Sequence, residues 1–296
     1  MTDRTYDHSE RPSRSNLSIT TYSPRSAMRN PSVLYKGMIQ DFRASWGLAW
    51  RLAIRDIKAQ YRQSYLGLLW AFITPLATTV AWIFLNSSGV VRVADTGIPY
   101  PVYVFTGTML WQLLVESIQS PLVQTTAAKS MLTKLNFPRE AVIISGAIKL
   151  LSSAGTKFLI LIPAIFLLGV VPDWHLALVP LAMLVLIVAG LSLGLILAPL
   201  GMIYSDVGRA IPLVAQFAIY LSPVVFAMPE EGKLLSIFQW NPATSLILTG
   251  RAWLTGSESP MLMQFLLVSG ASVVVLLVGW ILYRITMPVM VERMST

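Results

Sequence analysis

Four basic residues recur at helical spacing in the N-terminal part of the chain, and the chemistry they offer is anion binding. At positions i, i+4, i+7 and i+11 stand Arg51, Arg55, Lys58 and Arg62. The residues that repeat this spacing on the opposite side of a helix are Trp46, Trp50, Ala53 and Ile57. The basic stripe suits lipid phosphates and the apolar side suits acyl chains. We therefore expect residues 41–65 to form an amphipathic helix on a membrane surface, whose basic stripe either anchors the chain or contacts lipid head groups.

A second polar stripe lies inside a later apolar stretch. Its members, again at i, i+4, i+7 and i+11, are Ser145, Lys149, Ser152 and Thr156, with Lys157 beside them. Lipid does not tolerate such a stripe, so it should face another helix or an aqueous path, where the two lysines could attract an anionic substrate such as a pyrophosphate-linked lipid. The alternative is a hydrogen-bonded seam between helices, with Lys149 reaching the inner surface and Lys157 paired with Glu116.

Aromatic residues are spread over several apolar segments, and their flat rings could stack on sugars if they face a conduit. Most aromatic side chains in membrane helices lie in the core or at the interface instead, so both interpretations stay open. The complete set of candidate conduit-lining residues is Lys149, Ser152, Thr156, Lys157, Glu116, Trp82, Tyr103, Trp111, Phe217 and Tyr220.

Sequence patterns typical of catalysis are missing. There is no phosphate-binding G-x-x-x-x-G-K-[ST] loop, no H-E-x-x-H and no G-x-S-x-G, the chain has no cysteine, and its only histidines are His8 and His175. The acidic residues are scattered and do not form a pair suited to magnesium. We therefore expect no enzymatic activity, no metal site and no bound cofactor in this chain.

The composition is that of a polytopic membrane protein. Hydrophobic residues make up 55% of the chain and charged residues 12%, against roughly 25% charged in a soluble domain. The net charge of +8 could indicate nucleic-acid binding. However, the basic residues concentrate before the first apolar segment, where the positive-inside rule is the simpler cause. We expect membrane lipids and no nucleic acid as partners.

Apolar segments long enough to cross a bilayer predict an all-α fold with six spans. They cover residues 66–85, 102–123, 141–170, 176–203, 210–228 and 261–287. An even number places both termini on one side, and the excess of Lys and Arg in the proposed inner segments makes that side the cytoplasm. Residues 1–40 should be a disordered cytoplasmic tail and residues 291–296 a short cytoplasmic C-terminus. In the fourth span Gly190, Gly194 and Ala198 predict close packing of two helix backbones.

Two connections carry further expectations. The outer segment from Pro229 to Pro260 is interrupted by apolar residues and should fold back into the outer leaflet as short re-entrant helices. The inner segment from Lys129 to Glu140 is apolar and basic and ends soon after Pro138. It is either a docking element held at the membrane surface or an ordinary basic loop.

Taken in order, these segments resemble the permease subunit of type-two ABC exporters, in the branch that exports polysaccharides or polyol phosphates such as O-antigen, teichoic acid and capsule. The resemblance covers roughly residues 45–290. The motifs that carry it are Arg55-Asp56, Tyr61-Arg62-Gln63-Ser64, Leu66-Gly67, Trp70, Pro75, Asn136-Phe137-Pro138-Arg139-Glu140, Tyr204-Ser205-Asp206-Val207, and Asn241-Pro242 with Arg251 downstream.

The resemblance implies a homodimer of this chain with two copies of a separate ATP-hydrolysing subunit, which binds the ATP and Mg. It makes the amphipathic stretch an interface helix in the bacterial cytoplasmic (inner) membrane. The ATPase coupling or gate element would be Asn136, Phe137, Pro138, Arg139 and Glu140. The outer gate would include Asn241, Pro242 and Arg251. An undecaprenyl-linked glycan would pass between the two copies.

Three other functions remain open from the sequence. A related permease could export a drug or another small hydrophobic molecule, although the long basic helix argues against it. An integral-membrane glycosyl or lipid transferase is disfavoured by the missing acidic metal site. A passive channel is weakened by the lack of a repeated polar motif that could form a ring.

Overall fold

The computed structural model describes residues 31–62, 65, 67–91, 96–134, 139–229 and 231–295. Every regular element in these ranges is a helix, which confirms the all-α expectation. The chain divides into two units, residues 1–41 and 42–296. Helix α2 (Pro31–Arg62) starts in the first unit, inside the segment expected to be a disordered tail, and continues into the second. All contacts described below lie within the second unit.

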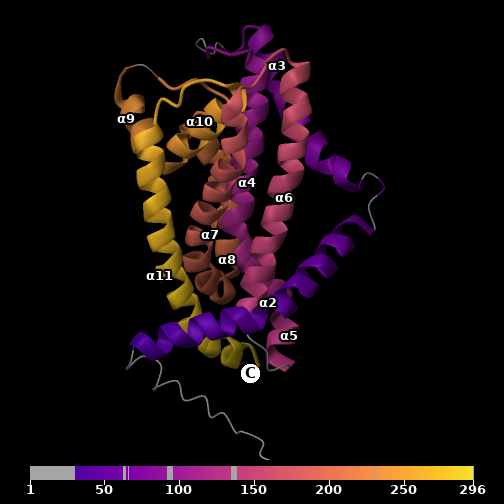
Figure 1. Ribbon diagram of the computed structural model, residues 1–296, viewed down its shortest axis with the longest axis vertical. Helices are drawn as coiled ribbons and strands as arrows, with labels where there is room; N and C mark the ends of the chain where they lie inside the picture. The colour runs from indigo at the N-terminus through magenta and orange to yellow at the C-terminus, as the bar shows by residue number, and fades with distance from the viewer. Residues whose placement is uncertain are drawn as a thin grey trace, which may run out of the picture. The chain divides into compact units, whose positions relative to one another are not determined.

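Long helices that run side by side dominate the second unit (Figure 1). After α2 come 3₁₀ helix η1 (Gly67–Leu69), α3 (Trp70–Ser87), α4 (Tyr100–Ala127), α5 (Lys129–Lys134), α6 (Glu140–Leu167), η2 (Trp174–Leu178), α7 (Val179–Ile203), α8 (Ser205–Ala218), η3 (Ile219–Leu221), α9 (Lys233–Trp240), α10 (Pro242–Thr255) and α11 (Leu262–Ser295). The segment of α2 that begins at Phe42 lies across the ends of α6 and α11, near α5 (Figure 1).

Three helical segments among the described residues are long and apolar enough to cross a membrane: Glu140–Leu167, Trp174–Ile203 and Leu262–Met287. The apolar helix at Phe72–Ser87 is shorter. Helix α4 has the length but is more polar, since it carries Gln112, Glu116 and Gln124. Most of α4 is buried against its neighbours, so little of its surface has to match lipid. In the predicted span at residues 210–228, α8 ends at Ala218, η3 continues it to Leu221, and a turn follows, so the helical part ends before residue 228.

The centre of the bundle is the contact between α4 and α7, and small residues allow it. A Cβ atom on Gly190 would collide with Ser117 and the Leu114 carbonyl, and one on Gly194 would collide with the Ile118 carbonyl and Pro121. The backbones of the two helices therefore approach as closely as the small-residue ladder predicts, which confirms its interpretation as a packing motif.

Substitution of Gly194 tests this contact. We expect Gly194→Val to destabilise the protein by about 2–3 kcal/mol, because the side chain would meet α4 backbone that cannot move aside. Thermal unfolding of the purified protein in detergent measures the effect. The matched control is Gly155→Val on α6, where an added Cβ meets nothing within 4 Å. Equal melting temperatures for the two variants would contradict the role assigned to the ladder.

Candidate functional site

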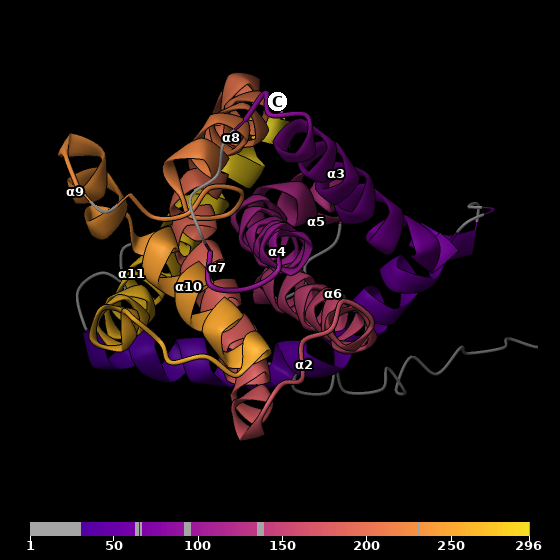
Figure 2. The same ribbon diagram turned by 90° about the horizontal axis from the view of Figure 1, so that it is seen from above.

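A cavity of about 430 Å³ opens between α3, α4 and the α8–η3 segment. Seen from above, α3 and α8 stand on the same side of α4, which supplies the back wall (Figure 2). The lining residues are Thr78, Trp82, Trp111, Gln112, Val115, Glu116, Ala215, Gln216, Ile219 and Tyr220. The cavity therefore brings together four residues predicted to line a conduit, namely Trp82, Trp111, Glu116 and Tyr220.

Aromatic rings in different planes form one wall of the cavity. The ring of Trp82 on α3 lies 6.2 Å from Tyr220 at 61° and 5.3 Å from Phe226 at 80°, measured between centroids. Trp111 is almost buried behind the cavity, whereas Tyr220 is 47% exposed. Tyr220 owes its place to η3, which continues α8 for one more turn. Exposed ring faces of this kind can take up the flat apolar side of a ligand.

The polar floor of the cavity is Glu116 of α4, which forms an ion pair with Lys157 of α6. Lys157 Nζ donates to Glu116 Oε1 at 2.8 Å, to Oε2 at 2.9 Å and to Ser153 Oγ at 2.9 Å, while Ser153 Oγ donates to Glu116 Oε2 at 2.8 Å. The Lys157 side chain is 4% exposed and that of Glu116 is 42% exposed. This pairing is the one expected if the polar stripe forms a hydrogen-bonded seam between helices, with Lys157 paired with Glu116.

The other members of the polar stripe occupy different environments. Ser145 is buried and its Oγ has no hydrogen-bond partner, whereas Ser152 is exposed. Lys149 Nζ lies 3.8 Å from Asp56 of α2, and Thr156 Oγ1 donates to the Ser152 carbonyl at 3.0 Å. The stripe is therefore not one continuous polar surface. None of its predicted members lines the cavity, and Lys157 is linked to it only through Glu116, which does line it.

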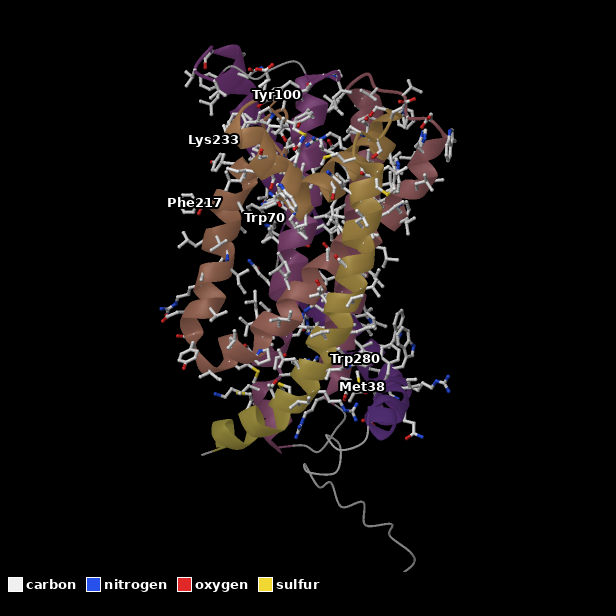
Figure 3. All side chains as sticks on the ribbon, turned by 90° about the vertical axis from the view of Figure 1, so that its left-hand side faces the viewer. Met38, Trp70, Tyr100, Phe217, Lys233 and Trp280 are labelled. Carbon is white, nitrogen blue, oxygen red and sulfur yellow. The ribbon has the colours of Figure 1, made fainter. Side chains whose placement is uncertain are left out.

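The two remaining aromatic candidates lie outside the cavity lining. Phe217 on α8 is 65% exposed and projects away from the other helices (Figure 3). Tyr103 is buried in the first turn of α4, where its hydroxyl lies 3.1 Å from the Pro223 carbonyl and 2.9 Å from that of Phe226. Tyr103 therefore serves the packing of the turn that follows η3.

Arg251 is the centre of the packing around Tyr103. Its guanidinium stacks on the Tyr103 ring, 3.6 Å from the centroid, and Nη2 donates to the Val224 carbonyl at 3.1 Å. Nε donates to Thr106 Oγ1 at 3.4 Å, while Nη1 is buried without a hydrogen-bond partner. Gly107 on α4 leaves the room that the guanidinium fills. Arg251 thus ties α10 to α4 and to the turn at residues 222–226.

Asn241 joins α9 to α10 and acts as a cap. Its Oδ1 accepts the Ala243 N–H at 3.0 Å, and its Nδ2 donates to the Leu221 carbonyl and to Ser222 Oγ, both at 2.9 Å. Pro242 occupies the first turn of α10, where no N–H is needed. The residues predicted as an outer gate therefore hold one buried element, α10, against the end of η3.

At the end of the bundle where α6 begins, the structure describes part of the predicted coupling element. Asn136, Phe137 and Pro138 lie outside the described residues, Arg139 precedes α6, and Glu140 is its buried first residue. Arg284 Nη1 of α11 donates to Glu140 Oε1 at 2.8 Å. Thr125 Oγ1 and Tyr283 Oη are 3.0 Å apart, and this contact links α4 to α11 at the residue before Arg284. The start of α6 is thereby fixed to α11.

The basic stripe of α2 is exposed at all four positions, Arg51, Arg55, Lys58 and Arg62. Trp46 and Trp50 are about half exposed, at 51% and 50%, on another face. A third face, which includes Ala49 and the fully buried Ala53, turns toward the protein, and Ala49 packs with Ala141 and Ile144 of α6. The helix therefore has three faces, and Ala53 belongs to the one packed on protein rather than with the tryptophans.

Polar lining residues that the sequence interpretation missed are Thr78, Gln112 and Gln216. Each stands four residues before a cavity residue that was predicted, namely Trp82, Glu116 and Tyr220. Residues at i and i+4 share one helix face, so this spacing was the signal that could have identified them.

Among the described residues, no group of three or more His, Asp and Glu side chains is placed to hold a metal ion. His175 pairs instead with Asp173, whose Oδ2 lies 2.6 Å from His175 Nδ1. Desolvation raises the pKa of the Asp173 carboxyl, but hydrogen bonds from His175 outweigh it, so the pKa lies below its ordinary value.

Comparison with known proteins identifies the class. Residues 48–251 match the family model described as ABC-2 type transporter. Because this match covers more than half of the chain, the protein belongs to the ABC-2 type transporter family.

Three relatives share one description, O-antigen export system permease protein RfbA. The one from Myxococcus xanthus is 25% identical over 238 residues, which cover 78% of this chain and 88% of the relative. Two from Klebsiella pneumoniae are 28% and 26% identical over 208 residues, covering 67% of this chain and 76% of each relative.

Proposed function

We propose that this chain is the membrane-spanning subunit of an ATP-driven ABC exporter that moves a lipid-linked polysaccharide across the bacterial cytoplasmic membrane. The cargo would be an undecaprenyl-linked glycan of the O-antigen or capsule type. The observation that carries the proposal is the family match over residues 48–251, joined by three relatives that are all described as O-antigen export permeases. The aromatic cavity between α3, α4 and α8 supports it, because sugar rings stack on exposed aromatic faces.

The exporter would be completed by a second copy of this chain and by two copies of a separate ABC ATPase, which bind the ATP and Mg. Support for the second copy comes from α3 and α8, which border the cavity and carry exposed apolar side chains outside its lining. These are Leu76, Val80 and Phe84 on α3 and Leu213, Val214 and Phe217 on α8. A second copy packed against α3 and α8 would bury these residues.

The proposed topology has six spans with both termini in the cytoplasm. In this arrangement α2 lies in the inner interface, with its basic stripe toward lipid phosphates and Trp46 and Trp50 toward acyl chains. Helices α9 and α10 form the outer re-entrant segment. The three long apolar segments and the predominance of basic residues in the proposed inner segments support this topology.

ATPase contact would be made by Asn136, Phe137, Pro138, Arg139 and Glu140. The bonds at the start of α6 support a coupling role. Movement of Glu140 would be passed to α11 through Arg284, and movement of α6 would reach α2 through Lys149 and Asp56. An inner contact could in this way change the positions of helices that border the proposed conduit.

Deletion of the gene and copurification test the proposal together. We expect the deletion strain to lose its surface polysaccharide and to accumulate the lipid-linked precursor, and a plasmid copy of the wild-type gene to restore the surface polymer. We also expect the tagged chain to copurify with a subunit that hydrolyses ATP. Normal surface polysaccharide in the deletion strain, together with a purified chain that brings no ATPase, would refute the proposed function.

A further inference from the structure

The ionised group that the cavity exposes is a carboxylate, although a lysine lies directly behind it. All three hydrogens of the Lys157 ammonium have acceptors in Glu116 and Ser153, and the Lys157 side chain is almost completely covered. Glu116 remains 42% exposed and borders the cavity. The pair is neutral as a whole, but its negative end faces the cavity and its positive end is buried in the protein.

The rest of the cavity lining contains no positive charge. None of the residues that line it within the described chain is Lys, Arg or His. Binding sites for phosphate or carboxylate groups use Arg or Lys side chains, or several free backbone N–H groups. The groups available here are the rings of Trp82 and Tyr220, the amides of Gln112 and Gln216, and the Glu116 carboxylate. Such a set fits a ring with one flat apolar face and several hydroxyl groups, because hydroxyls donate to carboxylate and amide oxygens.

We infer that this cavity selects uncharged sugar units and rejects anionic ones, such as uronic acids or phosphate-bridged units. A hydroxyl of a neutral sugar can donate to Glu116 while its ring stacks on Trp82 or Tyr220. An anionic unit in the same place would bring a second negative charge against Glu116 with no free cation to compensate it. The inference rests on the proposed function, since it names the class of glycan that the exporter handles.

A matched pair of oligosaccharides tests the inference: oligogalacturonate and its fully methyl-esterified form, with the same rings and length but different charge. The full-length chain in nanodiscs, together with any copurifying ATPase, is titrated with each, and binding is followed by saturation-transfer NMR on the sugar protons. We expect the neutral ester to bind at least about fivefold more tightly than the acid. We expect Trp82→Ala to weaken binding of the ester about three- to tenfold.

The variant Glu116→Gln supplies the decisive contrast, because it removes the exposed negative charge and keeps the shape. We expect it to lose the preference for the ester, since the Lys157 ammonium then remains as the charge at the cavity. Glu258→Gln is the matched control, with the same change at an exposed site outside the cavity lining, and should keep the preference.

The comparison of the two sugars on the unmodified chain decides the matter even if Glu116→Gln fails to fold. Equal or tighter binding of the acid would overturn the inference, and so would the absence of saturable binding of either sugar. This result is independent of the proposed function, which is judged by surface polysaccharide and ATPase copurification. An exporter could pass that test and still accept anionic glycans.

Discussion

Reversal of the charge at Lys157 is expected to remove the folded protein from the membrane, and a compensating reversal at Glu116 is expected to restore it. Lys157→Glu would place a second carboxylate beside Glu116, at a position where the Lys157 side chain is only 4% exposed. Both Glu116 oxygens, which now accept hydrogen bonds from the Lys157 ammonium, would then face a negative charge. Breaking a fully buried ion pair costs about 3–5 kcal/mol. Glu116 is 42% exposed, so water reduces this cost. We therefore expect Lys157→Glu to lower the free energy of unfolding by at least about 2 kcal/mol, which changes the folding equilibrium roughly thirtyfold. The double variant Glu116→Lys with Lys157→Glu rebuilds the pair with opposite polarity.

The amount of monodisperse protein after detergent extraction, together with its melting temperature, measures these effects. Asp206→Lys is the control, because Asp206 and Arg209 form a pair 3.8 Å apart whose side chains are 91% and 84% exposed. A pair this exposed contributes little, so the control should behave as the wild type. If the double variant stays as poorly folded as Lys157→Glu alone, the site depends on which helix carries which charge, and the pair has more than a packing role.

The sequence could predict that this ion pair exists but could not predict where it faces. A charged residue inside an apolar helix needs a partner, and Glu116 was the available acidic residue in the preceding span. Which end of the pair would be exposed depends on how α4, α6 and α8 are rotated around their axes. Helical periodicity places a residue on a face of its own helix and carries no information on the neighbour that the face meets. For the same reason Ser145, Lys149 and Ser152 share a stripe but not an environment.

The amphipathic helix shows the same limit. Spacing alone separated the basic residues of α2 from the apolar ones, and the four basic side chains are indeed exposed. It could not divide the apolar residues further, because a hydrophobic side chain that packs on protein and one that faces lipid look identical in sequence. Burial of Ala49 and Ala53 and exposure of Trp46 and Trp50 make that division. Ala49 lies against α6, where a small side chain lets two helices approach closely.

Contacts between residues far apart in the chain were the least predictable. The ladder of Gly190 and Gly194 was recognisable because small residues repeat at one helical spacing. Gly107 has no such partner in its own helix, so nothing nearby marks it. Its role appears only when α10 folds back and Arg251 takes the space beside it. Tyr103, expected in a conduit, is buried for the same reason, since Arg251 and the turn at residues 222–226 cover it.

Loss of Arg251 is expected to loosen the aromatic wall of the cavity from a distance. Together with Tyr103, Arg251 holds the turn at residues 222–226, and this turn carries Phe226, whose ring lies 5.3 Å from that of Trp82. Arg251→Met would leave the Val224 carbonyl without its donor and remove the cation from the Tyr103 ring. We expect about 2–4 kcal/mol of destabilisation, because a buried hydrogen bond to a charged group and a cation–π contact are lost together. Arg251→Lys should recover only part of this, since an ammonium cannot stack and donate as a planar guanidinium does.

Gly107→Ala tests the same contact from the opposite side. An alanine inside a helix ordinarily stabilises it by about 0.5–1 kcal/mol relative to glycine. Here the added Cβ would collide with Arg251 Nη2 and with the Val224 carbonyl, so we expect Gly107→Ala to destabilise the protein instead. Gly270→Ala on α11, where a Cβ meets nothing within 4 Å, should show the ordinary gain in stability.

Hydrogen exchange of residues 222–228 and thermal unfolding measure the effects of Gly107→Ala and Arg251→Met. We expect faster exchange in Gly107→Ala and Arg251→Met but not in Gly270→Ala, because only the first two substitutions release the turn from α10. Unchanged exchange in both would mean that the turn is held by Tyr103 and Asn241 without the arginine.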